Sequence, residues 1–145
     1  MKDRFFLDTN IFVYSFDRGA TSKMRRATQL LRQAVVTGKG VISFQVVQEF
    51  FNVALRRFEH PMTLAEAEQY FATVLRPMLA VHSTPALYVQ ALRLCEEHRL
   101  SWYDSLIVAA AMDGQCGVLY SEDMQHEQRF GDMTIVNPFL AKTSG

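Results

Sequence analysis

The sequence predicts an α/β fold in which helices cover both faces of a central parallel sheet of about five strands. Two observations support this fold class: short apolar segments alternate with longer segments, and the longer segments repeat their apolar residues at helical spacing. Parallel strands joined by helices require right-handed crossovers. With 145 residues, of which 49% are apolar and 21% charged, we expect a single domain over residues 1–145.

The first elements are a strand and two helices. Residues 4–7 form a short apolar strand that ends at Asp8, and the apolar segment 10–16 is expected to be helical. Thr21 or Ser22 can cap a longer helix, which Gly38 ends.

The next elements repeat this order. Residues 41–43 form a second strand, and Ser43 can cap a helix that runs to about Phe58. Thr63 and Glu66 have the spacing of a capping box at the start of a further helix.

Proline and glycine residues delimit the remaining elements. Pro77 is expected to end the preceding helix, and Thr84-Pro85 to open another that runs to about His98. Ser101 starts a helix that is apolar nearly all round, which predicts burial on most sides. The remaining strands are expected over residues 79–82, 117–121 and 134–136.

Composition narrows the class of protein. No apolar run reaches the roughly 20 residues of a membrane span, and the N-terminus lacks the apolar stretch of a signal peptide. Cys95 and Cys116 are too few for a disulfide framework, so we expect reduced thiols in a cytoplasmic protein.

The net charge is zero, but basic and acidic residues are unevenly distributed. Residues 1–60 hold ten Lys and Arg against five Asp and Glu (net +5), and residues 61–145 hold five against ten (net −5). This asymmetry permits a local phosphate-binding face in the first part of the chain. The residues that dominate it are Lys23, Arg25, Arg26, Arg32, Arg56 and Arg57.

Four carboxylates fall just after a predicted strand or in the first turns of a predicted helix: Asp8, Glu49, Asp104 and Asp123. In a parallel α/β sheet these positions lie at the carboxyl edge, where such sheets place their sites. Carboxylates gathered at one edge repel one another unless a cation joins them. The pattern therefore suggests a Mg²⁺ or Mn²⁺ site.

Each acid taken alone also fits an ordinary structural role. Asp8 can be a helix N-cap, and Glu49 a solvated helix residue. Asp104 stands at capping-box spacing from Ser101. Asp123 can belong to a turn, and the adjacent Glu122 could be the ligand in its place.

Other catalytic patterns are missing from the sequence. There is no Gly-rich phosphate loop and no Gly-x-Ser-x-Gly nucleophile elbow. The four histidines lack zinc-ligand spacing, and His126, three residues after Asp123, is the only one near a candidate acid.

Together these segments resemble the PIN-domain ribonucleases, in particular the VapC-type toxins of type II toxin–antitoxin pairs. The segments that carry the resemblance are FLDTNIF (6–12), SFQVVQEF (43–50), WYDSLIVAAA (102–111), YSEDMQH (120–126) and IVNPF (135–139). Their order and spacing span essentially the whole chain. The sequence departs from many relatives at residues 124–127, where MQHE replaces a further carboxylate or a glycine.

The resemblance implies a three-layer α/β/α PIN-like domain and a metal-dependent endoribonuclease. It implies that Asp8, Glu49, Asp104 and Asp123 form the acidic quartet, with Asp8, Asp104 and Asp123 holding Mg²⁺ or Mn²⁺. Asn10 and Ser121 match positions that help to orient this site. The implied partners are an RNA substrate, a cognate antitoxin protein and a second copy in a homodimer, with no membrane.

Two other functions stay open at this point. One is a Mg²⁺-dependent phosphohydrolase of the haloacid-dehalogenase type, although Asp8-Thr9-Asn10 lacks the second Asp of that class. The other is a non-catalytic PIN-like module that binds RNA or protein.

Overall fold

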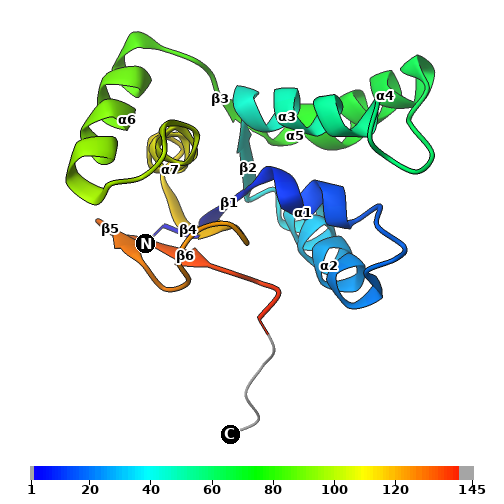
Figure 1. The fold of residues 1–145 in the computed structure, drawn as a ribbon, viewed down its shortest axis with the longest axis horizontal. Coiled ribbons are helices and arrows are strands. Elements are labelled where there is room, and N and C mark those ends of the chain that lie inside the picture. The colour runs from blue at the N-terminus through cyan, green and yellow to red at the C-terminus, as the bar shows by residue number, and fades with distance from the viewer. Residues whose placement is uncertain (1, 141–145) are drawn as a thin grey trace, which may run out of the picture.

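The computed structural model describes residues 2–140, so the predicted domain, residues 1–145, extends beyond the described residues at both ends. Its sheet has the strand order β3-β2-β1-β4-β6-β5 (Figure 1). All neighbouring strands are parallel except β5 and β6. The strands are β1 (Arg4–Leu7), β2 (Gly40–Ser43), β3 (Leu79–Val81), β4 (Cys116–Tyr120), β5 (Arg129–Phe130) and β6 (Met133–Val136).

The predicted fold class is confirmed, but the described residues form six strands where about five were expected. The additional strand is β5, which pairs with β6 in a tight antiparallel hairpin at the edge of the sheet. Gly131 takes a positive φ of 60° in the turn between them. Two residues are too short to show the alternation by which a strand is recognised in sequence.

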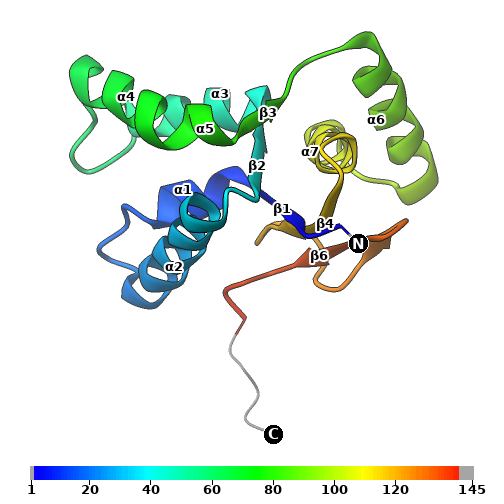
Figure 2. The ribbon, with the colours of Figure 1, turned by 180° about the vertical axis from the view of Figure 1, so that it is seen from behind.

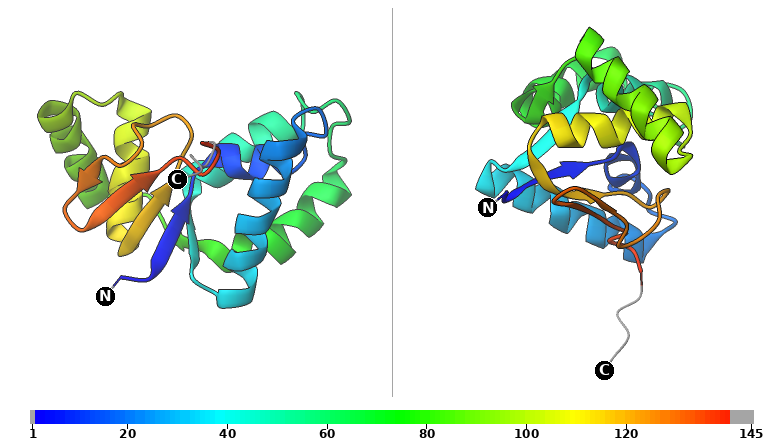
Figure 3. Two further views of the ribbon diagram at one scale, coloured as in Figure 1. Left: turned by 90° about the horizontal axis from the view of Figure 1, so that it is seen from below. Right: turned by 90° about the vertical axis from the view of Figure 1, so that its left-hand side faces the viewer.

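Helices lie on both faces of the sheet. Figure 3 shows α7 over one face, with α6 outside it, and α2 beneath the other. Helices α3, α4 and α5 lie together beside β3, as Figure 2 shows from behind. The helices are α1 (Thr9–Tyr14), α2 (Thr21–Thr37), α3 (Phe44–Ala54), α4 (Leu64–Tyr70), the π-helix η1 (Phe71–Leu75), α5 (Arg76–Met78), α6 (Pro85–His98) and α7 (Trp102–Asp113).

Several predicted helix ends are confirmed. Thr63 and Glu66 form a full capping box, because each side chain binds the other residue's backbone N–H. The Thr84 side chain caps α6, whose first residue is Pro85. Gly38 ends α2 in the left-handed conformation, with φ at 68°.

Three other predicted ends are wrong. The N-cap of α2 is Ala20, because the turn before the helix lets the Ala20 carbonyl accept the first helical N–H, from Met24, at 2.9 Å. Helix α3 ends at Ala54 and not near Phe58, since the chain turns back and the Met62 N–H binds the Ala54 carbonyl.

Pro77 does not end its helix. The helix continues to Met78, and the π-helical turn η1 ends at Leu75, two residues before the proline. Pro77 has no N–H to continue the ordinary ladder of hydrogen bonds, and a wider turn accommodates this loss without stopping the helix.

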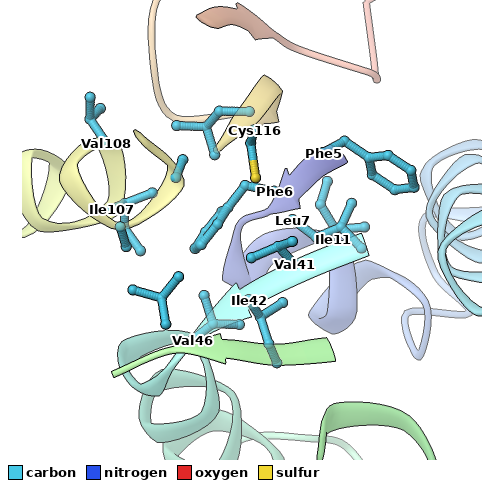
Figure 4. Packing of buried hydrophobic residues seen from close by; sticks show 14 of the residues in the cluster. Phe5, Phe6, Leu7, Ile11, Val41, Ile42, Val46, Ile107, Val108 and Cys116 are labelled. Carbon is cyan, nitrogen blue, oxygen red and sulfur yellow. The ribbon is translucent and has the colours of Figure 1, made fainter. Parts of the chain in front are cut away.

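The core lies on both sides of β1 and β2 (Figure 4). Phe6 and Leu7 are fully buried, and every residue of β2 is buried, as expected for strands covered on both faces. In α7, residues 105–111 are all buried, which confirms the burial expected from its apolar surface. Cys95 and Cys116 are free thiols. No helix within residues 2–140 has the length and apolar character needed to cross a membrane.

Gly40 lies where α2 packs closely against the sheet. A Cβ at this position would lie 2.5 Å from the Cβ of Ala34 and 3.2 Å from the Sδ of Met78. We expect Gly40→Ala to lower the free energy of unfolding by about 1–3 kcal/mol, since a packed helix must move to admit the methyl group. Thermal unfolding measures this loss.

Gly19→Ala is the matched control for that change. Gly19 is exposed, and only the Oδ1 of Asp17, at 3.3 Å, lies near the added methyl group. Equal unfolding temperatures for the two variants would contradict the close packing at Gly40.

Candidate active site

Asp8 is the buried centre of the candidate site. It follows β1 directly and is the N-cap of α1, and the residue is only 6% exposed. Its Oδ1 accepts the Thr9 N–H at 2.7 Å, and its Oδ2 accepts the Ser121 hydroxyl at 2.7 Å. The N-cap role is therefore confirmed, but it uses only Oδ1 and does not explain the hydrogen bond from Ser121 to Oδ2.

Burial raises the pKa of Asp8 to about 6. The hydrogen bonds from Ser121 and Thr9 oppose this increase, while the charges of Glu49 and Asp123 add to it. Ionising this buried carboxyl group costs free energy, and a neighbouring cation would stabilise its ionised form.

Glu49 is not a free surface residue. It lies on α3 and is half-buried, and both of its carboxylate oxygens accept hydrogen bonds. Oε2 accepts the Thr9 hydroxyl at 2.7 Å, and Oε1 accepts the Gln45 Nε2 at 2.8 Å. Thr9 therefore links Glu49 to Asp8, because its hydroxyl binds Glu49 and its N–H binds Asp8. Glu49 is thus not the freely solvated helix residue considered from the sequence.

Gln45 is a site residue that sequence reasoning missed. It is buried, and besides Glu49 its Nε2 lies 3.4 Å from the carbonyl of Tyr103, next to Asp104. The one signal in the sequence was a polar residue four positions before Glu49, on the same side of the helix.

Asp104 lies in the first turn of α7 and is half-buried. The Ser101 hydroxyl caps this helix by accepting the Asp104 N–H at 3.2 Å. Burial raises the pKa of the Asp104 carboxyl, and the charges of Asp123 and Glu49 raise it further. A hydrogen bond with Ser101 lowers the pKa of Asp104 in part, so the cap also involves its carboxyl group, but this group is close enough to Asp123 and Glu49 for their charges to act on it.

Asp123 lies in the loop after β4 and is exposed. Its Oδ2 accepts the Asn10 Nδ2 at 3.1 Å, and its N–H donates to the Ser121 hydroxyl at 3.3 Å. Asn10 and Ser121, predicted to orient the site, thus contact Asp123, and Ser121 also contacts Asp8.

Sheet topology explains why four distant acids meet. Strands β2, β1 and β4 are parallel neighbours, so the residues that follow them reach the same edge of the sheet. Asp8 follows β1, Asp123 follows β4, and Glu49 belongs to the helix after β2. Helix α7 leads into the start of β4, which places its first turn, with Asp104, at the carboxyl edge.

The other candidate groups after β4 are engaged elsewhere. Both carboxylate oxygens of Glu122 are bound by Tyr14 and Lys23. His126 accepts the Asn137 N–H on Nδ1, and its Nε2 lies 3.6 Å from exposed Glu127. Within residues 2–140, Glu122, His126 and Glu127 form no hydrogen bond with Asp8 or Asp104.

The donor set suits a hard divalent cation in its chemistry. It consists of carboxylate oxygens, and the Oδ1 of Asn10 is a buried acceptor with no hydrogen-bond partner. Within residues 2–140, however, no three His, Cys, Asp or Glu side chains stand close enough together to ligate one ion directly. Mg²⁺ commonly keeps several water ligands and takes one or two carboxylates, which this arrangement provides.

The basic residues of the first part of the chain divide into two groups. Lys23 is paired with Glu122, and Arg26 donates to the Pro138 carbonyl. The other four residues that dominate the positive charge are exposed: Arg25, Arg32, Arg56 and Arg57.

Fold and site together define an α/β domain with an acidic cluster at the carboxyl edge of its central parallel strands. The sequence matches the PIN domain family over residues 5–129, and the chain belongs to that family. The PIN resemblance inferred from the sequence is thereby confirmed.

Solved structures with this fold include proteins of toxin–antitoxin systems. A toxin–antitoxin complex from Klebsiella pneumoniae has a TM-score of 0.67 at 20% identity and covers 92% of this chain and 96% of its own. The sarcin–ricin loop cleaving toxin VapC20 of Mycobacterium tuberculosis has a TM-score of 0.59 at 21% identity, covering 82% and 89%. FitAcB from Neisseria gonorrhoeae has a TM-score of 0.64 at 16% identity, covering 93% and 98%. No curated protein is similar enough in sequence to count as a match.

Proposed function

We propose that this protein is a Mg²⁺- or Mn²⁺-dependent endoribonuclease and the VapC-type toxin of a toxin–antitoxin pair. The observation that carries the proposal is the hydrogen-bonded cluster in which Thr9, Asn10 and Ser121 connect Asp8, Glu49 and Asp123 at one edge of a PIN domain. Membership of the family and the toxin named among its structural neighbours support RNA as the substrate.

Three acids would hold the metal, one or two of them directly and the others through water ligands: Asp8, Asp104 and Asp123. A bound divalent ion supplies an activated water and neutralises charge on the phosphate oxygens. Ser121 and the Thr9 N–H fix both oxygens of Asp8, and Asn10 fixes one oxygen of Asp123. Because the attacking group is water, the site needs no Ser, Cys or His nucleophile.

Glu49 serves the same site from α3. Thr9 and Gln45 each donate to one of its oxygens, which fixes the plane of the carboxylate. Its remaining lone pairs can accept a proton or a hydrogen bond from a water near Asp8 and Asp104. We therefore assign Glu49 to orienting the water or completing the metal site.

The partners follow from the same proposal. Exposed arginines of the first part of the chain, such as Arg25 and Arg32 on α2, would contact the RNA backbone. A cognate antitoxin that blocks the site and a homodimer are proposed by analogy with the toxin–antitoxin complex of the same fold. We place the protein in the cytoplasm, where its RNA substrate is found.

Metal removal tests the proposal. We expect the purified protein to cleave RNA with Mg²⁺ or Mn²⁺, to stop when EDTA is added and to recover when excess Mn²⁺ is returned. The measurement is the cleavage of a labelled RNA. A parallel assay with p-nitrophenyl phosphate tests for general phosphatase activity.

Each other outcome points to a different function. Cleavage that EDTA does not affect would contradict the metal role. Hydrolysis of p-nitrophenyl phosphate without RNA cleavage would favour a phosphohydrolase. Metal binding in a calorimetric titration without any hydrolysis would favour a non-catalytic module.

A further inference from the structure

Two consecutive acids follow β4, and their surroundings differ. The Glu122 side chain is 24% exposed and is enclosed by α1 and α2. Asp123 is exposed and accepts a hydrogen bond from Asn10. Only Asp123 is available to the candidate site.

Glu122 is held by a clamp that consists of Tyr14 and Lys23. The Tyr14 hydroxyl donates to Oε1 of Glu122 at 2.6 Å, and the Lys23 Nζ donates to Oε2 at 2.6 Å. Lys23 also donates to the Tyr14 oxygen at 3.2 Å and lies over the Tyr14 ring, 4.7 Å from its centroid. Phe139 packs edge-on against the same ring, with the centroids 5.0 Å apart.

The clamp and the site share helix α1. Asn10 and Tyr14 are four residues apart, so they lie on the same face of α1, one turn from each other. Asn10 binds Asp123 and Tyr14 binds Glu122, while Ser121 binds Asp8. Each residue of the segment 121–123 is therefore fixed by its own contact to α1 or to its cap.

We propose that Tyr14, Lys23 and Glu122 are positioning residues that set where Asp123 stands relative to Asp8 and Asp104. The clamp also pairs the Glu122 charge with Lys23, so this carboxylate neither competes for a cation nor adds to the repulsion among the site acids. This inference rests on the proposed metal-dependent function.

Loss of the clamp should weaken metal binding more than it affects the fold. Contacts that orient metal ligands typically change metal affinity by about 10- to 100-fold when they are removed. Lys23 and Glu122 are partly exposed, and Tyr14→Phe keeps the ring that packs against the edge of the core, so the unfolding temperature should change little.

The experiment is a calorimetric titration of Mn²⁺ into the full chain and its variants. We expect Tyr14→Phe, Glu122→Gln and Lys23→Ala each to weaken Mn²⁺ binding about tenfold or more. Lys23→Arg keeps the positive charge and should retain most of the affinity. Lys39→Ala is the control, because it removes another surface ion pair, with Asp3, at the opposite edge of the sheet.

Wild-type affinity in Tyr14→Phe and Glu122→Gln would overturn the proposal, as would an equal loss in Lys39→Ala. If the wild-type chain binds no Mn²⁺, the proposed function fails. Amide hydrogen exchange then tests separately whether the clamp positions Asp123. In that case Tyr14→Phe should speed exchange at the Asp123 amide, which donates to Ser121, and unchanged exchange would overturn the clamp.

Discussion

Replacing Asp8 with Asn is expected to abolish metal-dependent RNA cleavage and to make the metal-free protein more stable. The rate of cleavage should fall by more than about 100-fold. Losing only a residue that orients a metal ligand already lowers metal affinity or activity by about 10- to 100-fold. Stability should rise because the wild-type carboxylate is buried, with its pKa raised to about 6 from 3.8. A difference of this size corresponds to about 3 kcal/mol at pH 7.5.

The hydrogen-bond geometry around Asp8 accommodates the substitution by Asn. An Asn at position 8 can still accept the Thr9 N–H with its oxygen, and its amide can donate to the Ser121 hydroxyl. RNA cleavage and thermal unfolding in EDTA measure the two effects. Asp113→Asn is the control, since Asp113 is an exposed acid at the far end of α7. Unchanged cleavage in Asp8→Asn would remove Asp8 from the site.

The stability of the metal-free protein is expected to rise as the pH falls from 7.5 to 5. The folded-state pKa of Asp8, about 6, lies above the unfolded value of 3.8, so between these values the folded state binds more protons than the unfolded state. Stability is therefore lost as the pH rises through this window and is lowest above it. Burial also raises the pKa of Asp104, which acts in the same direction.

The measurement is thermal unfolding in EDTA at several pH values, for the wild type and for Asp8→Asn. All other titratable groups are shared by the two proteins, so the difference between the two profiles isolates Asp8. That difference should reach about 1–1.5 kcal/mol between pH 7.5 and pH 5. Saturating Mg²⁺ should flatten the wild-type profile, and parallel profiles in EDTA would contradict the buried, cation-dependent carboxylate.

Local signals predicted most of the elements. The Thr63–Glu66 capping box, the Thr84-Pro85 start and the Gly38 end were read directly from the sequence, because each depends on backbone contacts a few residues apart. The wrong helix ends are those that depend on contacts beyond the nearest residues in the sequence. Ala54 ends α3 because the chain returns to it through Met62, and the helix passes Pro77 by widening into a π-turn.

The site divides in the same way. Asp8, Glu49, Asp104 and Asp123 were chosen for their positions after strands and at helix starts, and the structure brings them to one edge as expected. Gln45 was missed, and Glu122 could not be separated from Asp123, because the sequence does not show which neighbouring side chain finds a partner. Lys23 and Tyr14 supply that partner from 99 and 108 residues away.

By itself, the sequence determined the alternation of strands and helices, the parallel sheet and the four acids at its carboxyl edge. These follow from periodicity, capping and turn chemistry, which act over a few residues. Only the tertiary structure decided that Asp8 is buried beside Ser121, that Thr9 joins it to Glu49, and that Glu122 is withdrawn from the site. Burial and ion pairing depend on residues brought together from distant parts of the chain, and it is these contacts that convert four separate carboxylates into one candidate site.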